Sequence, residues 1–255
     1  MMKFVTFNLR CDYNQDGVNC FVYRQPLILR VIGEEQPDII SFQEVLPHMA
    51  AWLKKSLRDY YVIGCGRSER LDGEQMSIAF RSDRFHLIQM HTFWLSETPH
   101  QPGSRYPEQS ICPRTCTEAL LMEEESGRVL RVLNTHLDHI GTLARKQGLT
   151  QILRHLESAV LFPDAPVILA GDFNAEPESE EMTVFRDYPD FTNVTRGIGV
   201  TYHGYMQAEE PEHIDYIFTR GALSCKAVRK WEHTENGVFL SDHYPICAEL
   251  DWAEA

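Results

Sequence analysis

The order of apolar and polar positions predicts a chain in which strands and helices alternate. Compact apolar runs such as FVTF and VILA are typical of strands that are covered on both faces. Apolar positions that recur every three or four residues predict helices instead. The pattern predicts strands at residues 4–8, 37–45, 61–64, 76–80, 85–93, 116–122, 129–136, 167–172, 214–218, 227–231 and 244–250.

Four helices are predicted between these strands, at residues 26–36, 48–57, 143–161 and 180–185. Pro26 is placed in the first turn of its helix, where its missing N–H costs nothing. The third helix carries Leu149, Ile152, Leu153, Leu156 and Val160 on one face. Because strands interleave with helices and also form hairpins, the sequence predicts a mixed-sheet α/β sandwich in a single domain, residues 1–255.

The composition of the chain limits which molecules it is suited to bind. The chain of 255 residues has 37 Asp and Glu against 24 Lys and Arg, a formal net charge of -13. Such a chain is poorly suited to hold duplex DNA through unspecific phosphate contacts, which depend on basic residues. Its seven cysteines lack metal-site spacing and are expected to be reduced. With neither a signal peptide nor a membrane span expected, a cytoplasmic protein is predicted.

Polar side chains that can bind a metal follow one predicted strand after another. If the strands are neighbours, their ends meet at one edge, where open α/β folds place their sites. Each residue alone has a structural explanation, since Asp and Asn are frequent in turns and a buried histidine is often only hydrogen-bonded. The repetition favours a shared site. Its members are Asn8, Glu44, His136, Asp172, Asn174, Asp215, Asp242 and His243.

Six segments in this order resemble the endonuclease/exonuclease/phosphatase superfamily, which has the fold of pancreatic DNase. They are TFNLR, SFQEV, NTHLDH, GDFNAEP, HIDYIF and SDHYPI. The resemblance implies a four-layer α/β sandwich, with two mixed sheets face to face and helices outside. It also implies metal-assisted hydrolysis of a phosphate ester. The segments TFWLSETP and GTLAR are similar to a bacterial branch near the deadenylase-type exonucleases, and Arg10 departs from the Asp usual in apurinic-site endonucleases.

A hard cation prefers carboxylate and amide oxygens, which fits a site without thiols. Mg²⁺ is therefore expected, with Mn²⁺ as a substitute. Glu44 is the expected direct ligand, with Asn8 beside it and Asp242 near by.

The resemblance also implies the roles of the remaining residues. Asp172 would orient or deprotonate the attacking water, and Asn174 would hold that water or a phosphate oxygen. His136 and His243 would donate to the non-bridging oxygens, with His243 as the other candidate for the base. Asp215 would fix the tautomer of His243. Sequence does not decide between Asp172 and His243.

Two arginines are weaker candidates for binding a substrate phosphate. Arg114 and Arg145 could act as bidentate donors, or each could belong to a surface or helix ion pair.

Three functions fit these residues. The first is a metal-dependent nuclease or exonuclease on single-stranded RNA or DNA, favoured by the branch resemblance. The second is a phosphatase or phosphodiesterase on a small-molecule, sugar, inositol or lipid phosphate, favoured by the acidic charge. The third, an inactive binding module, is disfavoured because the metal-binding residues are all present. Endo- or exonuclease mode, the number of metals and the oligomeric state stay open.

Overall fold

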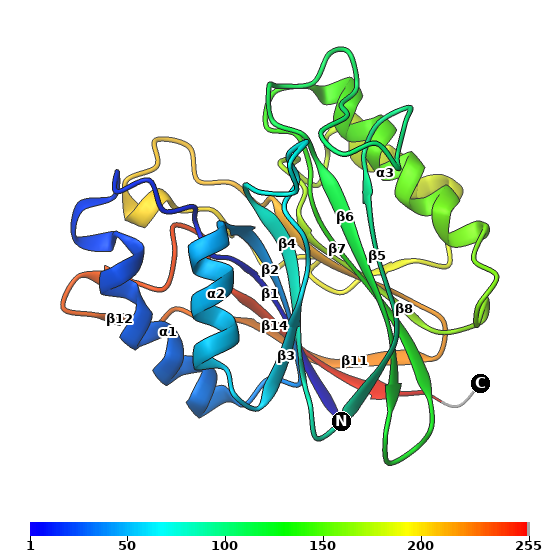
Figure 1. Cartoon of the computed structure of the whole chain (residues 1–255), viewed down its shortest axis with the longest axis horizontal. Coiled ribbons are helices and arrows are strands. Elements are labelled where there is room, and N and C mark those ends of the chain that lie inside the picture. The colour runs from blue at the N-terminus through cyan, green and yellow to red at the C-terminus, as the bar shows by residue number, and fades with distance from the viewer. Residues whose placement is uncertain (254–255) are drawn as a thin grey trace.

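Two six-stranded sheets pack face to face in the computed structural model, which describes residues 1–253 (Figure 1). The first sheet has the order β11 (Leu223–Lys230), β14 (Ile246–Trp252), β1 (Met2–Asn8), β2 (Ile39–Val45), β4 (Gln75–Arg81) and β3 (Tyr60–Ile63). The second has the order β5 (Phe85–Trp94), β6 (Thr115–Glu123), β7 (Val129–His136), β8 (Val167–Asp172), β10 (Asp215–Arg220) and β9 (Thr192–Asn193).

Both sheets are mixed, because each contains a parallel pair among antiparallel ones. In the first sheet β1 runs parallel to β2, and in the second β7 runs parallel to β8. A small hairpin of β12 (Thr234–Glu235) and β13 (Val238–Phe239) stands apart from them. The predicted four-layer sandwich is therefore confirmed. Of the predicted domain, residues 1–255, the last two lie outside the described residues.

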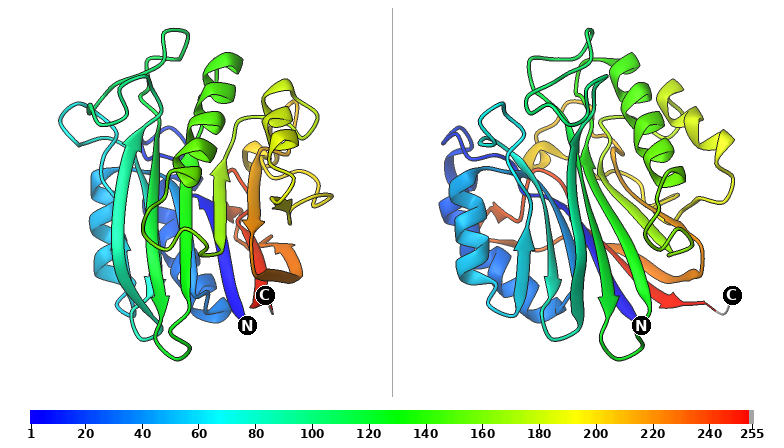
Figure 2. Two further views of the ribbon diagram at one scale, coloured as in Figure 1. Left: turned by 90° about the vertical axis from the view of Figure 1, so that its right-hand side faces the viewer. Right: turned by 45° about the vertical axis from the view of Figure 1, so that its right-hand side comes forward.

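Helices form the two outer layers (Figure 2). On the first sheet, α1 (Phe21–Glu35) and α2 (Pro47–Ser56) bury their apolar faces against residues such as Val5 and Ile40. On the second, α3 (Thr142–Glu157) packs against residues such as Leu169. Short 3₁₀ helices complete the fold at η1 (Gly17–Asn19), η2 (Glu180–Asp187) and η3 (Gly204–Met206). Every helix within residues 1–253 is too short or too polar to span a lipid bilayer.

The layer between the sheets changes from apolar to polar along the strands. Near the start of β1 it contains Phe4 and, from the neighbouring strand, Ile39, both fully buried. Further along, Gln43 Nε2 donates to Asn134 Oδ1 across the two sheets at 2.7 Å. Asn134 Nδ2 in turn donates to the carbonyl oxygens of Phe42 and Ser77, each at 2.8 Å. This buried link between β2 and β7 fixes how one sheet lies on the other, because its breakage would leave polar groups unpaired.

Two predicted helix boundaries are wrong. The first helix begins at Phe21, so Pro26 lies inside it and one backbone hydrogen bond is lost. Tertiary contacts compensate, since the Phe21 ring packs edge-on to Trp52 with centroids 5.0 Å apart.

The third helix ends at Glu157 instead of residue 161, and Val160, predicted on its apolar face, is 92% exposed. Phe162 precedes Pro163 and has a φ of 50°. A residue before proline is disfavoured in the α region, so the chain leaves the helix before it reaches β8.

Candidate active site

Three of the predicted site residues, Asn8, His136 and Asp172, lie on the face of their strands that is between the two sheets. In β1 the buried Phe4 is followed two residues on by Thr6 and four residues on by Asn8. The same two-residue period leads from Leu130 and Val132 to Asn134 and His136, and from Ile168 and Ala170 to Asp172. Because alternate side chains of a strand share a face, the inner layer itself continues into the site.

Glu44 departs from this alternation through a distortion of β2. Its neighbour Gln43 already points between the sheets, so a regular strand would turn Glu44 toward the helices. Instead the pairing of β2 with β4 shifts register between Phe42 and Val45, and Glu44 has a φ of 60°. Such a φ is costly for a residue with a side chain and is typical of functional sites. The distortion brings the Glu44 carboxylate to Asn8, whose Nδ2 donates to Glu44 Oε1 at 3.0 Å.

Asp172 occupies the centre of the cluster, and its two oxygens have different surroundings. Oδ1 accepts the backbone N–H of Asn174 at 2.9 Å, which is the turn-forming contact expected of an Asp at a strand end. Oδ2 accepts from Asn8 Nδ2 at 3.0 Å and lies 3.5 Å from His136 Nε2 and 3.8 Å from His243 Nε2. One oxygen thus serves the turn, while the other faces the polar cluster.

The residue before Asp172 has to be glycine. Gly171 has a φ of 145°, and a Cβ there would lie 1.8 Å from the carbonyl oxygen of Thr135 on the parallel strand β7. This close approach puts Asp172 beside His136, its register partner.

Asp215 and His243 form a pair behind the centre. Asp215 begins β10 and is the register partner of Asp172 on the other side of β8. His243 Nδ1 lies 2.8 Å from Asp215 Oδ2, and its Nε2 lies 3.4 Å from Asn8 Nδ2. A carboxylate on Nδ1 fixes the orientation of the ring and leaves Nε2 directed toward the cluster.

Burial and neighbouring charges shift the pKa values of this cluster apart. Burial, followed by the charge of Asp215, raises the pKa of Asp172 to about 7. Burial opposes protonation of His243, but Asp215 prevails through its charge and hydrogen bond and raises the pKa of His243 to about 10. Burial and the charge of Arg114 hold the pKa of His136 well below its ordinary value. Groups with such divergent pKa values are typical of acid–base sites.

A cleft of about 480 Å³ opens over this cluster. It is lined by seven of the residues that the sequence predicted, namely Glu44, Arg114, His136, Asp172, Asn174, Asp242 and His243. Asn8 and Asp215 are buried and hold lining residues from behind. The residues predicted from separate strand ends therefore come together.

Arg145 is not among the residues that line the cleft. Its guanidinium is bound by Glu181, by the carbonyl oxygen of Asp138 at 3.0 Å and by Thr142 Oγ1 at 3.1 Å. The arrangement is the helix ion pair that was the alternative explanation for this residue.

Several lining residues had not been predicted from the sequence as members of the site. Arg67 and Glu74 come from the loop between β3 and β4, and Arg10 follows β1 with its Nε 3.5 Å from Asp242 Oδ2. Neither end of the 64–74 loop carries an apolar period or a strand-end pattern. For Arg10 the signal was that it is the last residue of the TFNLR segment.

The donor atoms fit a hard divalent cation. Glu44, His136 and Asp172 bring ligand atoms within 4.8 Å of one another, and Asp242 adds a carboxylate to the same cleft. Most of these donors are oxygens, as Mg²⁺ and Mn²⁺ prefer. Asn8 turns its NH₂ group toward the carboxylates, while its Oδ1 accepts the Arg10 N–H at 2.9 Å.

Known proteins are similar to this chain in sequence or in structure. A structure from Bacteroides vulgatus, described as an endonuclease/exonuclease/phosphatase, is 29% identical over 98% of both chains, with a TM-score of 0.92. A mannosyl-6-phosphatase of Bacteroides thetaiotaomicron is 25% identical over 99% of this chain and 100% of its own, with a TM-score of 0.89. A 3'-5'-exoribonuclease subunit of the CCR4-Not complex, from Candida albicans, is 22% identical over 89% of this chain and 37% of its own length.

The two-sheet sandwich and its cluster of carboxylates, histidines and amides define a metal-dependent phosphoesterase. The chain belongs to the endonuclease/exonuclease/phosphatase family, whose sequence model matches residues 5–243.

Proposed function

We propose that residues 1–255 act as one hydrolase domain that uses Mg²⁺ or Mn²⁺ to hydrolyse a phosphate ester of a small molecule. The observation that carries this proposal is the cleft of about 480 Å³ over Asp172, with the pair of His243 and Asp215 behind it. Its volume is that of a pocket for a small ligand. The net charge of -13 disfavours a long polyanion.

The cation would be held by Glu44 and Asp242. Asn8 fits a positioning role better than a ligand role, because its NH₂ group donates to Glu44 and Asp172. When bound, the cation supplies positive charge that offsets the charge developing on the phosphoryl oxygens.

The chain's own residues would carry the proton and orient the water. Asp172 Oδ2 accepts a hydrogen bond from the attacking water and takes its proton as the water oxygen bonds to phosphorus, which a pKa near 7 favours at neutral pH. The P–O bond of the ester breaks in the same reaction, and the leaving oxygen takes a proton from solvent to depart as the alcohol. His243, held by Asp215, donates from Nε2 to a non-bridging oxygen. His136 supports the other side of Asp172, at 3.5 Å, and Asn174 lines the cleft beside them.

A second candidate is a nuclease that removes nucleotides from single-stranded RNA or DNA. It is supported by the similarity to the Candida albicans exoribonuclease subunit across 89% of this chain. The two candidates differ in the size of the leaving group that the cleft must admit.

A substrate panel separates them. We expect the purified protein with Mg²⁺ to release phosphate from sugar phosphates and 4-nitrophenyl phosphate at rates at least ten times those on oligo(A) or single-stranded DNA of equal phosphate concentration. The measurements compared are the rate of phosphate release from the small esters and the rate at which a labelled oligonucleotide is shortened. Rapid shortening with negligible release from small esters would establish the nuclease instead.

Metal dependence is tested at Glu44. Chelation by EDTA should abolish activity, and added Mg²⁺ or Mn²⁺ should restore it. Glu44→Gln should raise the Mg²⁺ concentration for half-maximal rate about tenfold or more, because it removes charge from a hard-cation site. The control is Glu249→Gln, on β14 beside Lys3 and away from the site. An unchanged metal requirement in Glu44→Gln would remove Glu44 from the ligand set.

A further inference from the structure

Two arginines in one wall of the cleft are buried without a full set of partners. Arg114, just before β6, is 3% exposed, and Arg67, from the 64–74 loop, is 8% exposed. Arg114 Nη2 pairs with His139 Nδ1 at 2.8 Å, and Arg67 Nη2 donates to Glu74 Oε1 at 2.6 Å. Within residues 1–253, Arg114 Nε, Arg114 Nη1 and Arg67 Nη1 have no hydrogen-bond partner.

A third buried arginine, Arg24, has a hydrogen-bond partner for each of its guanidinium nitrogens. Arg24 has no exposed surface, and its three nitrogens donate to the carbonyl oxygens of four residues at 2.7–3.2 Å. Buried polar groups are almost always paired, so the unpaired N–H groups of Arg67 and Arg114 call for an acceptor that comes from outside the chain.

Both guanidinium groups line the same cleft, and their positive charges oppose each other. Burial is the first cause that lowers the pKa of Arg114, and the charge of Arg67 is the second. Like charges placed together cost free energy unless an anion lies between them. Asp138 and Glu74 offset part of this charge, with Asp138 Oδ1 3.5 Å from Arg114 Nε, a contact that lacks hydrogen-bond geometry.

The part of the cleft wall that contains Arg67 and Arg114, here called the arginine wall, adjoins the proposed hydrolytic centre. After burial, the charge of Arg114 is the largest cause that lowers the pKa of His136, and His136 Nε2 lies 3.5 Å from Asp172 Oδ2. A phosphoryl group over Asp172 is therefore within the same cleft as both arginines. The unpaired nitrogens are themselves shielded from bulk water, so an acceptor has to enter the wall of the cleft to reach them.

From this geometry we infer that Arg67 and Arg114 form a subsite for the dianionic phosphoryl group of a phosphomonoester, and that they select monoesters over diesters. The inference rests on the proposed function, since it concerns the phosphate that is hydrolysed. A monoester brings two negative charges and three free oxygens, whereas a diester brings one charge and two free oxygens. Guanidinium N–H groups bind such oxygens in a fixed geometry.

The first test measures binding without hydrolysis. Inorganic phosphate is titrated calorimetrically into the protein at pH 8 with EDTA present, so that the arginines act without a cation. Arg67→Gln and Arg114→Gln should each weaken binding about 10–100-fold, the effect of losing charge-assisted hydrogen bonds. The matched control is Arg84→Gln, another partly buried arginine with ion pairs to Asp38 and Glu123.

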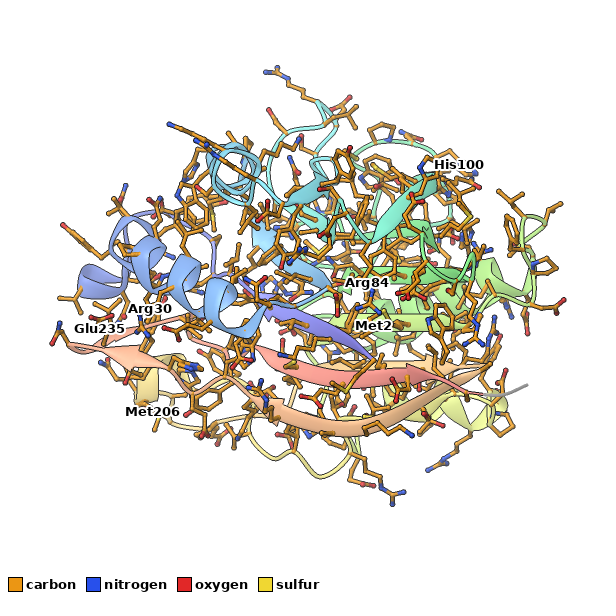
Figure 3. All side chains as sticks on the ribbon, turned by 90° about the horizontal axis from the view of Figure 1, so that it is seen from below. Met2, Arg30, Arg84, His100, Met206 and Glu235 are labelled. Atoms are coloured by element: carbon orange, nitrogen blue, oxygen red, sulfur yellow. The ribbon has the colours of Figure 1, made fainter. Side chains whose placement is uncertain are left out.

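Arg84 is suited to this purpose because it lies at the opposite end of β1 from Asn8. Its Nη2 donates to the carbonyl oxygen of Met1, and it appears beside Met2 in Figure 3. Its substitution should leave phosphate binding within twofold of the unsubstituted protein.

The second test uses kinetics with a matched pair of substrates, 4-nitrophenyl phosphate and its methyl ester, in the presence of Mg²⁺. The unsubstituted protein should favour the monoester in kcat/KM by at least tenfold. Arg67→Gln and Arg114→Gln should reduce that ratio by tenfold or more, while Arg114→Lys, which keeps the charge, should retain part of it. If the glutamine variants do not fold, the inference is tested by the monoester-to-diester ratio of kcat/KM in the unsubstituted protein and in Arg114→Lys.

The outcomes separate this inference from the proposed function. Metal-dependent hydrolysis with equal use of both esters, or with a ratio that neither arginine changes, would overturn the subsite and leave the hydrolase intact. Phosphate binding that depends on both arginines, without hydrolysis of any ester, would keep the subsite and overturn the hydrolase. Absence of phosphate binding in EDTA together with an unchanged ratio would mean that water alone fills the arginine wall.

Discussion

Asp172→Asn is expected to lower the single-turnover rate about 10²–10⁴-fold, the range for loss of a positioned general base. The loss corresponds to about 3–5 kcal/mol of barrier. Asparagine keeps an oxygen that can accept the Asn174 N–H, the turn contact that Asp172 Oδ1 makes at 2.9 Å. It cannot take a proton from water. Substrate affinity should hold or rise, because one negative charge beside the phosphate is removed.

The measurement is rapid-quench single turnover together with equilibrium binding of the substrate in the absence of the metal. Asp187→Asn, an exposed residue of η2, is the matched control. Thermal unfolding of both variants checks that the fold persists. A near-normal rate in Asp172→Asn would mean that this carboxylate serves only the turn at the end of β8.

His243→Ala is expected to be as damaging, with a rate loss of about 10²–10⁴-fold. Asp215→Asn should cause a smaller loss, because it acts through the orientation of the ring. The double variant Asp215→Asn/His243→Ala should be no slower than His243→Ala alone. Asp215 Oδ2 lies 2.8 Å from His243 Nδ1, so the two residues should behave as one unit.

A double-mutant cycle on single-turnover rates measures this dependence. Each variant is also assayed with added imidazole, which can rescue a missing side chain but not a collapsed site. Additive losses in the double variant would show that Asp215 acts independently of His243. The combination Asp172→Asn/His243→Ala should likewise lose much less than the product of the single effects.

The strand ends were predictable because their signals are local. Alternation in β1, β7 and β8 carries each apolar run directly into a polar residue, and Gly171 precedes Asp172 in the sequence. Because these strands pair with one another in the sheets, the polar residues at their ends come together. The four-layer sandwich follows from the same pattern together with the six family segments.

Other features depend on contacts that no local pattern records. Pro26 lies within a helix whose first residue, Phe21, packs on Trp52 of α2. Arg67 reaches the cleft from a loop that has neither an apolar period nor a motif. Arg145, which was a candidate for phosphate binding together with Arg114, is bound to Glu181 instead. For long charged side chains the partner decides the direction, and the partner is distant in the sequence.

The link between Gln43 and Asn134 has a consequence for how new specificities arise on this scaffold. It lies within the strands, so the relative placement of the two sheets does not depend on the 64–74 or 96–113 loops. Loops can be exchanged between homologues, or redesigned in the laboratory, while the hydrolytic residues keep their spacing. Directed evolution toward a new substrate should therefore accumulate its changes in those two loops and leave Gln43 and Asn134 untouched.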